Sequence, residues 1–227
     1  MSPSLHSDRQ YEADLRQLRE RLLLMAGRVE EMIERSVRAL VERDAALAKA
    51  TIESDHKVNR AEIEIDEHCL LVLVKRQPMA SDLRFVTHSL KMVTDLERIG
   101  DLAVNICERA IDLAPFPMLR PCEEIPDMAA IVEAMVKGAI DAFVARDSRS
   151  AEEVMARDDE VDEYYHAIFR KTLALMIDDP RLVERGVHVQ SVAKYLERIG
   201  DHATNLAEHV IFMVRAKDVR HSGKLDD

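Results

Sequence analysis

Apolar side chains recur at three- and four-residue intervals over most of this 227-residue chain, and that periodicity predicts long amphipathic helices. One seam consists of positions spaced seven residues apart, the spacing at which packed helices meet. The same seam returns 103 residues later. Its members are Thr51, Val58, Ile65 and Val72 in the first half and Val154, Val161, Ile168 and Leu175 in the second.

Prolines divide this pattern. Four of the seven prolines fall between residues 113 and 127, where the missing amide hydrogen of proline stops a helix. Asp44 and Asp147 precede a helix at equivalent places in the two halves, and a short acceptor side chain there caps free amides. The pattern therefore predicts three helices in each half, at residues 9–42, 45–76 and 80–112 and at residues 127–146, 148–178 and 181–217.

These helices predict an all-α fold made by tandem duplication of two three-helix bundles. Helices joined by short turns bury their apolar seams against one another. We expect the first bundle at residues 9–112, a Pro-rich linker at 113–126, the second bundle at 127–217 and a polar tail at 218–227.

Composition narrows the function classes. The net charge is −11, so the surface would repel phosphate backbones, and we do not expect nucleic acid as a partner. The three cysteines form neither a CxxC pair nor an even framework, which indicates a reducing compartment. The first residues lack a signal-peptide pattern, and no run approaches the roughly 20 apolar residues of a membrane span. We therefore expect a soluble, cytoplasmic protein.

A polar motif occurs twice. Residues 96–108 read LERIGDLAVNICE and residues 196–208 read LERIGDHATNLAE, at a constant offset of 100. Matching apolar positions would show only a repeated helix, whereas matching carboxylates, amides and glycines indicate the same site chemistry in each half. The shared positions are Glu97, Arg98, Gly100, Asp101, Asn105 and Glu108, matched by Glu197, Arg198, Gly200, Asp201, Asn205 and Glu208.

The acids of each motif lie on one helix face. At about 100° per residue, Glu97, Asp101, Asn105 and Glu108 fall within about 80° of one another, opposite the apolar face. A solvated polar face is the ordinary explanation of such a stripe. Two features favour a cation site instead. Carboxylates four residues apart repel each other unless a cation lies between them, and glycine inside a helix costs up to about 1 kcal/mol unless another group must approach closely.

The preceding helix of each half carries further oxygen donors, because Asp55 and Asn59 correspond to Asp158 and Asp162. Only this first turn repeats, since aromatic residues replace the next acids in the second half. Carboxylate-rich sites suit magnesium, manganese, calcium or iron, and zinc where a histidine joins. The predicted metal ligands are Asp55, Asn59, Glu97 and Asp101 in the first bundle and Asp158, Asp162, Glu197 and Asp201 in the second.

Two Glu-x-x-His matches leave an alternative open. Glu53–His56 and Glu163–His166 have the spacing of ligand pairs in di-iron carboxylate bundles, so a helical metalloenzyme is the alternative function. The matches fall at non-equivalent places in the repeat, and chance alone predicts about one. A third interpretation is a purely structural helical scaffold whose acidic stripes are only solvated.

Other polar residues near the stripes have ordinary explanations. His202 and His209 lie beside the second stripe without counterparts in the first half. Arg98 and Arg198 flank the stripes, and we expect them to pair with acids of the neighbouring helix. Cys107 falls on the core-facing side. The sequence contains no Ser/His/Asp or Cys/His nucleophile signature, so we do not expect an enzyme.

Three motifs identify a family resemblance. One is LERIGD followed by Asn and Glu, which is present twice, and the others are QPMASDLR at residues 77–84 and DEVDEYY at residues 159–165. In these motifs and in its duplicated layout the chain resembles the PhoU family of bacterial phosphate-signalling proteins, over about residues 10–217. The resemblance implies two similar three-helix bundles that carry iron or other divalent ions on their acidic motifs. Iron, zinc, manganese and magnesium are the candidate metals, and the matching residues are the eight ligands given above.

The resemblance also implies a function. Family members are negative regulators of the phosphate-starvation (Pho) response and of high-affinity phosphate uptake, without enzymatic activity. The implied partners are the ATPase subunit of the phosphate ABC transporter and a membrane sensor histidine kinase. A homodimer is the assembly we expect.

Overall fold

The computed structural model describes residues 3–217 and 219, and every regular element in that part of the chain is a helix. The all-α prediction is therefore confirmed. Apart from Val219, the predicted polar tail at 218–227 lies outside the described residues.

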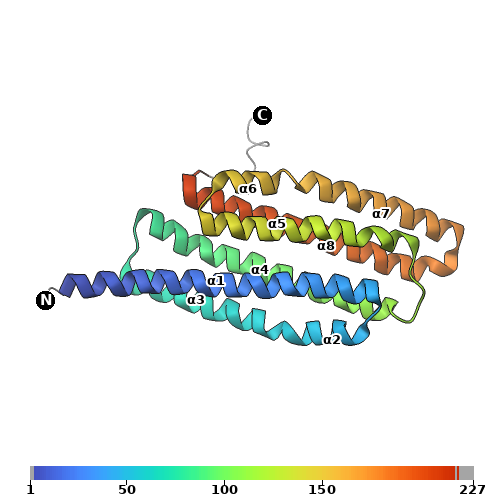
Figure 1. The fold of residues 1–227 in the computed structure, drawn as a ribbon, viewed down its shortest axis with the longest axis horizontal. Coiled ribbons are helices and arrows are strands. Elements are labelled where there is room, and N and C mark those ends of the chain that lie inside the picture. The colour runs from blue at the N-terminus through green and yellow to red at the C-terminus, as the bar shows by residue number, and fades with distance from the viewer. Residues whose placement is uncertain (1–2, 218, 220–227) are drawn as a thin grey trace.

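Two layers of long helices run along the molecule (Figure 1). One layer holds the first half of the chain and the other holds the second half. The elements of the first layer are α1 (Pro3–Glu42), α2 (Ala45–Ser54), α3 (His56–Arg76) and α4 (Ala80–Leu113). Those of the second are η1 (Arg120–Glu124), α5 (Ile125–Ala145), α6 (Ser148–Met155), α7 (Asp158–Asp178), η2 (Pro180–Leu182) and α8 (Val183–Arg215).

The two predicted helix caps are confirmed. Asp44 accepts hydrogen bonds from the amides of Ala46 and Leu47, both at 2.9 Å. Asp147 accepts one from the amide of Arg149 at 2.9 Å. Each aspartate satisfies amides that have no partner inside the helix, and this fixes where α2 and α6 begin.

The second helix of each half is kinked, contrary to the continuous helices predicted at 45–76 and 148–178. At the first kink the amide of Asp55 bonds to the carbonyl of Ile52 at 3.1 Å. At the second kink the amide of Arg157 bonds to the carbonyl of Val154 at 3.1 Å. Bonds between residues three apart tighten the backbone locally and turn the axis. The kinks place Asp55 and Asp158 at the start of α3 and α7.

The apolar seams form the core as predicted. Of the eight seam residues seven are buried, and Leu175 is half-buried. The core also includes Leu96 and Leu196, the fully buried first residues of the two repeated motifs. Burying a leucine side chain stabilises a fold by roughly 1.5–3 kcal/mol. One cluster of buried side chains runs through both halves, with α4 packed along α8 between the layers.

The Pro-rich connection is short and ordered. It contains η1, and Leu119, Pro121 and Cys122 are buried within it. Pro126 lies in the first turn of α5, where its missing amide hydrogen costs nothing. No helix within the described part of the chain combines the length and apolar character needed to cross a membrane.

Candidate functional site

The repeated glycines bring the acidic faces together. A Cβ atom on Gly100 would lie 3.4 Å from Cγ1 of Val58 and 3.6 Å from Oδ1 of Asp55. The same construction on Gly200 gives 3.4 Å to Cγ1 of Val161 and 3.7 Å to Oδ1 of Asp158. The predicted close approach of another helix is therefore confirmed in both halves. The first turn of α3 packs on α4 just as the first turn of α7 packs on α8.

The first acidic face joins α3 to α4. Nδ2 of Asn59 donates to Oδ2 of Asp55 at 2.8 Å. Oδ1 of Asp55 and Oδ1 of Asn59 are buried and have no hydrogen-bond partner among the described residues. Two acceptor oxygens without donors beside the Gly100 contact favour a bound cation, because a buried acceptor without a partner costs free energy.

Charge repulsion marks the first face. Burial raises the pKa of Asp55, and the nearby charge of Asp101 raises it further. Burial also raises the pKa of Glu97, and the charges of Asp101 and Glu62 add to that effect. Ionised carboxylates are thus disfavoured here without a positive partner. The raised pKa values connect acids of α3 with acids of α4, as the sequence predicts for a shared site.

The second face repeats this arrangement between α7 and α8. Burial raises the pKa of Asp158, and the charges of Asp201 and Asp162 raise it further. Burial likewise raises the pKa of Asp201, with the charge of Glu197 as the next cause. The side chain of Glu197 is only 14% exposed, and its Oε2 atom has no hydrogen-bond partner among the described residues.

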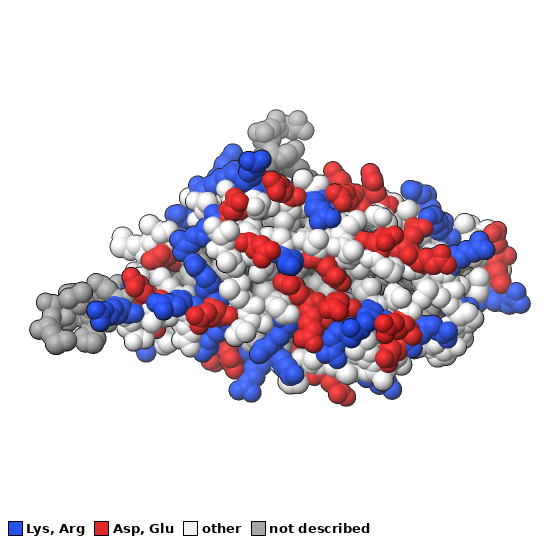
Figure 2. Space-filling view, viewed as in Figure 1, with Lys and Arg blue, Asp and Glu red and all other residues white. Residues whose placement is uncertain are grey.

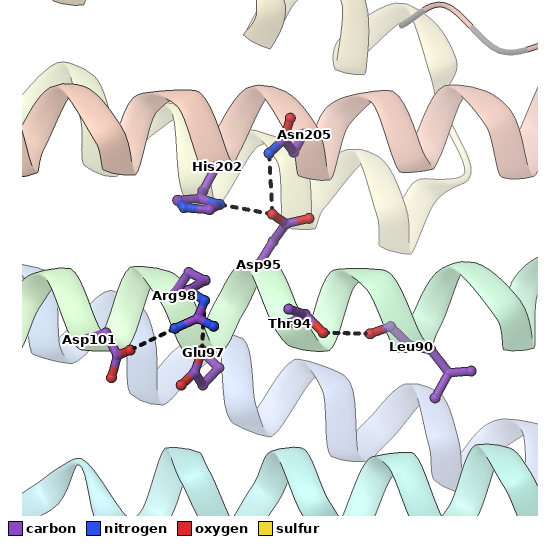
Figure 3. Close-up of polar contacts among 8 residues, drawn as sticks. All are labelled: Leu90, Thr94, Asp95, Glu97, Arg98, Asp101, His202 and Asn205. Atoms are coloured by element: carbon purple, nitrogen blue, oxygen red, sulfur yellow. Dashed lines mark hydrogen bonds and ion pairs between the residues drawn. The ribbon is translucent and has the colours of Figure 1, made fainter.

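Basic side chains neutralise part of each face from the same helix. Arg98 contacts Glu97 at 3.5 Å and Asp101 at 3.3 Å (Figure 3). We expected Arg98 to pair with acids of the neighbouring helix; its close contacts are to its own helix, while its charge also lowers the pKa of Glu62 on α3. A residue three positions from an acid on one helix reaches it with little reorganisation. On the second face, Nζ of Lys194 contacts Oε1 of Glu197 at 2.6 Å.

The chemical type of the predicted ligands suits a hard cation. It offers carboxylate and amide oxygens, the ligands that magnesium, manganese and iron accept. Within the described residues, however, no three His, Cys, Asp or Glu side chains are arranged as a ready metal site. Metal binding by the eight residues therefore remains a prediction. The paired acids would hold the cation after the side chains of Arg98 and Lys194 move away from them.

A third polar cluster joins the two bundles, and the sequence analysis missed its central residue, Asp95. Oδ1 of Asp95 contacts Nδ1 of His202 at 2.8 Å, and Oδ2 contacts Nε2 of His209 at 3.1 Å. Nδ2 of Asn205 donates to Oδ1 at 3.3 Å. Figure 3 shows Asp95 on α4 reaching across to His202 and Asn205 on α8. His209 also lies 3.4 Å from His88, between the two Nδ1 atoms.

This cluster explains why the two histidines have no counterparts. They face the first bundle instead of their own acidic face, so a search for matched positions leaves them out. Tyr195 stands where the repeat would place a second Asp95. Burial alone would raise the pKa of Asp95, but hydrogen bonds from His202 and His209 outweigh it and lower the pKa to about 2. The sequence signal for this cluster was that His202, His209 and Asp95 are polar residues without counterparts in the other half.

The Glu-x-x-His matches do not form a di-iron site. His56 is exposed, and its ring nitrogen contacts the backbone carbonyl of Glu53 instead of sharing a metal with the carboxylate. His166 is also exposed and packs beside the ring of Tyr165. Ligands of a di-iron carboxylate centre converge inside a bundle. The metalloenzyme alternative therefore has no support.

The sequence matches the family model for the PhoU domain twice, over residues 22–110 and 125–210. The chain belongs to the PhoU family. A PhoU homologue of the phosphate-specific transport system from Pseudomonas aeruginosa is 41% identical over 96% of this chain and 90% of that protein. The corresponding PhoU homologue of Rhizobium meliloti is 37% identical over 96% of this chain and 92% of that protein.

Solved PhoU structures share the fold. The crystal structure of PhoU from Pseudomonas aeruginosa superposes with a TM-score of 0.89 at 40% identity, covering 91% of this chain and all of that one. The phosphate transport system regulatory protein PhoU from Streptococcus pneumoniae gives a TM-score of 0.85 at 25% identity, over 92% of this chain and 99% of that one. The PhoU resemblance and the duplicated bundles are thus confirmed. PhoU proteins are regulatory accessory proteins and not enzymes.

Proposed function

We propose that this protein is a negative regulator of the phosphate-starvation response and of high-affinity phosphate uptake. It acts as a cytoplasmic adaptor without enzymatic activity. Membership of the PhoU family supports a regulatory role in phosphate transport, since similar proteins are named accessory proteins of the phosphate-specific transport system. Three buried free cysteines accord with a reducing compartment.

The duplicated acidic faces carry the metal-binding part of this proposal. Each face presents the acids of α4 or α8 to the first turn of α3 or α7, packed on Gly100 or Gly200. Iron, zinc, manganese or magnesium would be held by the paired carboxylates, with Asp55/Asn59 completing the first face and Asp158/Asp162 the second. The bound ion would offset the repulsion that raises the pKa of these acids.

The proposed partners are the ATPase subunit of the phosphate ABC transporter and a membrane sensor histidine kinase. Apolar side chains on the outer faces of the layers provide surface for such contacts and for a homodimer. On α3, Leu70 is 57% exposed and Val74 is 77% exposed, and on α7, Ile177 is 70% exposed. Exposed apolar side chains grouped on one helix face are typical of protein contact surfaces.

Deletion of the gene tests the regulatory role. During phosphate-replete growth, the deletion strain should express alkaline phosphatase and the high-affinity transporter, and a plasmid copy of the wild-type gene should restore repression. The regulatory proposal would be wrong if alkaline phosphatase and the transporter stayed repressed in the deletion strain while phosphate starvation still induced both proteins.

Copurification tests the adaptor role separately. A tagged chain recovered from phosphate-replete cells should bring down the transporter ATPase and the sensor kinase. The tagged variant Leu70→Glu/Val74→Glu, which places charges on the proposed contact face of α3 and leaves the core unchanged, should bring down less of both partners. Recovery of neither partner by the wild-type chain would contradict the adaptor role.

A further inference from the structure

A hollow of about 190 Å³ opens between the two layers, where α1, α4, α5 and α8 come together. Three arginines from three elements line it: Arg19 of α1, Arg84 of the early part of α4 and Arg146 at the end of α5. No acidic side chain lines it within the described chain. Figure 2 shows basic side chains gathered at the left of the face, near the ends of α5 and α8.

No acid among the described residues compensates the positive charges of the hollow. None of these three guanidinium groups takes part in an ion pair between described residues. Nε of Arg19 is buried without a hydrogen-bond partner there. Burial lowers the pKa of Arg19, and the charge of Arg146 lowers it further. Nε of Arg84 reaches the carbonyl of Met213 only at 3.5 Å.

The duplicated half offers an internal control. Arg43 occupies the place equivalent to Arg146, and both end a helix in the left-handed conformation. Arg43 donates to the carbonyl of Ala114 from Nε at 3.1 Å and from Nη2 at 2.7 Å. The hollow beside it measures only about 20 Å³. In the first half the chain itself satisfies the arginine, whereas the side chain of Arg146 has no acceptor among the described residues.

Acids near the hollow in sequence are engaged elsewhere. Asp82 accepts a hydrogen bond from the hydroxyl of Tyr11 at 2.7 Å. Asp147 accepts one from Ser150 at 2.7 Å and caps α6. Neither carboxylate lines the hollow. The described part of the chain therefore supplies no anion to the three arginines.

Aromatic rings line part of the hollow. The rings of Phe85 and Phe143 stack with centroids 5.9 Å apart, one from each bundle. The guanidinium carbon of Arg19 lies 5.4 Å above the Phe85 ring, a cation–π contact that orients its donors. Ser81 adds a hydroxyl at the first turn of α4, where the helix end carries partial positive charge. Donors held in place before binding lose less entropy when a ligand arrives.

We propose that this hollow binds a tetrahedral oxyanion of the phosphate class, either free inorganic phosphate or the phosphate of a phosphomonoester. Guanidinium groups donate in pairs to the oxygens of such anions. Three of them approaching from different helices match several oxygens and a charge of about −1.5 to −2 better than they match the two oxygens and single charge of a carboxylate. This site stands apart from the acidic faces, and it does not depend on the regulatory role.

Calorimetric titration of the full chain with inorganic phosphate tests the proposal at constant ionic strength. We expect saturable binding of one phosphate per chain by the wild type. Arg19→Gln and Arg146→Gln should each weaken it at least about tenfold, as expected for a lost charge-assisted hydrogen bond. The matched control is Arg181→Gln, which removes an exposed arginine paired with Asp179 in η2 and should leave the affinity unchanged.

Three further ligands define the anion. Sulfate should compete with phosphate and acetate should not, because the arginines are arranged for a tetrahedral anion. Glycerol 3-phosphate identifies the source: tighter binding than phosphate assigns a phosphomonoester, and weaker binding assigns free phosphate.

The metal-free melting temperature of Arg146→Gln should be at or above that of the wild type, because the variant removes repulsion from Arg19. Absence of saturable phosphate binding by the wild type, or equal loss in Arg181→Gln and Arg146→Gln, would overturn the proposal.

Discussion

Asp95 ties the two bundles together through a single carboxylate. Its side chain is 13% exposed, and it accepts from His202, His209 and Asn205 of the other bundle. A buried carboxylate is stable only when donors satisfy it, and here α8 supplies all three. The pairing of α4 with α8 therefore depends on a charge in addition to apolar packing.

Replacing Asp95 tests this contribution through its pH dependence. The pKa of Asp95 is about 2 in the folded chain, below the ordinary value near 3.9 in the unfolded chain. Its stabilisation is therefore fully present above about pH 4 and is lost as the pH falls towards 2. Asp95→Asn should lower the free energy of unfolding at pH 7 by about 2 kcal/mol, measured by urea denaturation.

The same comparison at low pH provides the control. The difference between wild type and Asp95→Asn should shrink steadily from pH 4 downwards, because the wild-type carboxylate then becomes neutral as well. A difference that stays constant over that range would mean that packing, and not the charge, accounts for the effect of the substitution.

Asp158 illustrates the opposite case, a carboxylate that destabilises the metal-free chain. Burial and the charges of Asp201 and Asp162 raise its pKa, so its ionised form is unfavourable at pH 7. Asp158→Asn should raise the stability of chelator-treated protein by a few tenths of a kcal/mol, the size of a like-charge pair. Added manganese or zinc should stabilise the wild type more than this variant, measured by thermal unfolding. Glu163→Gln, at an exposed position of α7, should respond to metal as the wild type does.

The kinked helices explain how the acidic faces are built. The tightened turns before α3 and α7 direct Asp55 and Asp158 towards Gly100 and Gly200. A side chain larger than a methyl group at either glycine would meet a buried valine of the kinked helix. The position of each face thus depends on an element boundary and on a residue no larger than alanine at the contact.

Two substitutions at Gly200 test this packing. Gly200→Ala should keep the wild-type stability or gain up to about 1 kcal/mol, since its methyl group stays 3.4 Å from Val161 and alanine favours helix. Gly200→Val should cost about 1–3 kcal/mol, because the branched side chain must push α7 away. Thermal unfolding of both variants gives the comparison. Equal stability of the two would show that α7 does not rest on the glycine.

Much of this element-level architecture could be predicted from the sequence. Seven-residue apolar spacing located the seams, and Asp44 and Asp147 located two helix starts. The kinks could not be predicted because no proline or glycine marks either bend in the sequence. At the first bend Asp55 even keeps right-handed helical backbone angles. Asp95 escaped because it has no repeated partner, and contacts between α4 and α8 depend on how the bundles dock.

On the scale of the whole molecule, the two halves share one core. Buried side chains of both repeats form a single cluster, and α4 of one layer packs against α8 of the other (Figure 1). Acidic side chains gather in the middle of one face (Figure 2). Glu30, Glu34 and Glu133 line a groove between α1 and α5. Burial raises the pKa of Glu30 and Glu133 there. The duplicated sequence therefore forms one structural unit with an acidic surface.

A shared core predicts cooperative unfolding. Scanning calorimetry should show one transition whose calorimetric and van't Hoff enthalpies agree, because neither bundle can unfold without exposing the apolar surface of the other. Asp95→Asn should move that transition to lower temperature without splitting it. Two separate transitions in the wild type would show that the bundles are independent domains.

The central claim is that the duplicated acidic motifs form two cation sites, one in each bundle. Metal content tests it most directly, on protein purified without chelators and compared with the variant in which Glu97, Asp101, Glu197 and Asp201 are all alanine. A control variant with Glu12, Glu20, Glu153 and Glu163 changed to alanine loses the same charge from exposed positions. We predict bound metal in the wild type and the control and its loss in the motif variant. Equal metal content in all three proteins would contradict the claim.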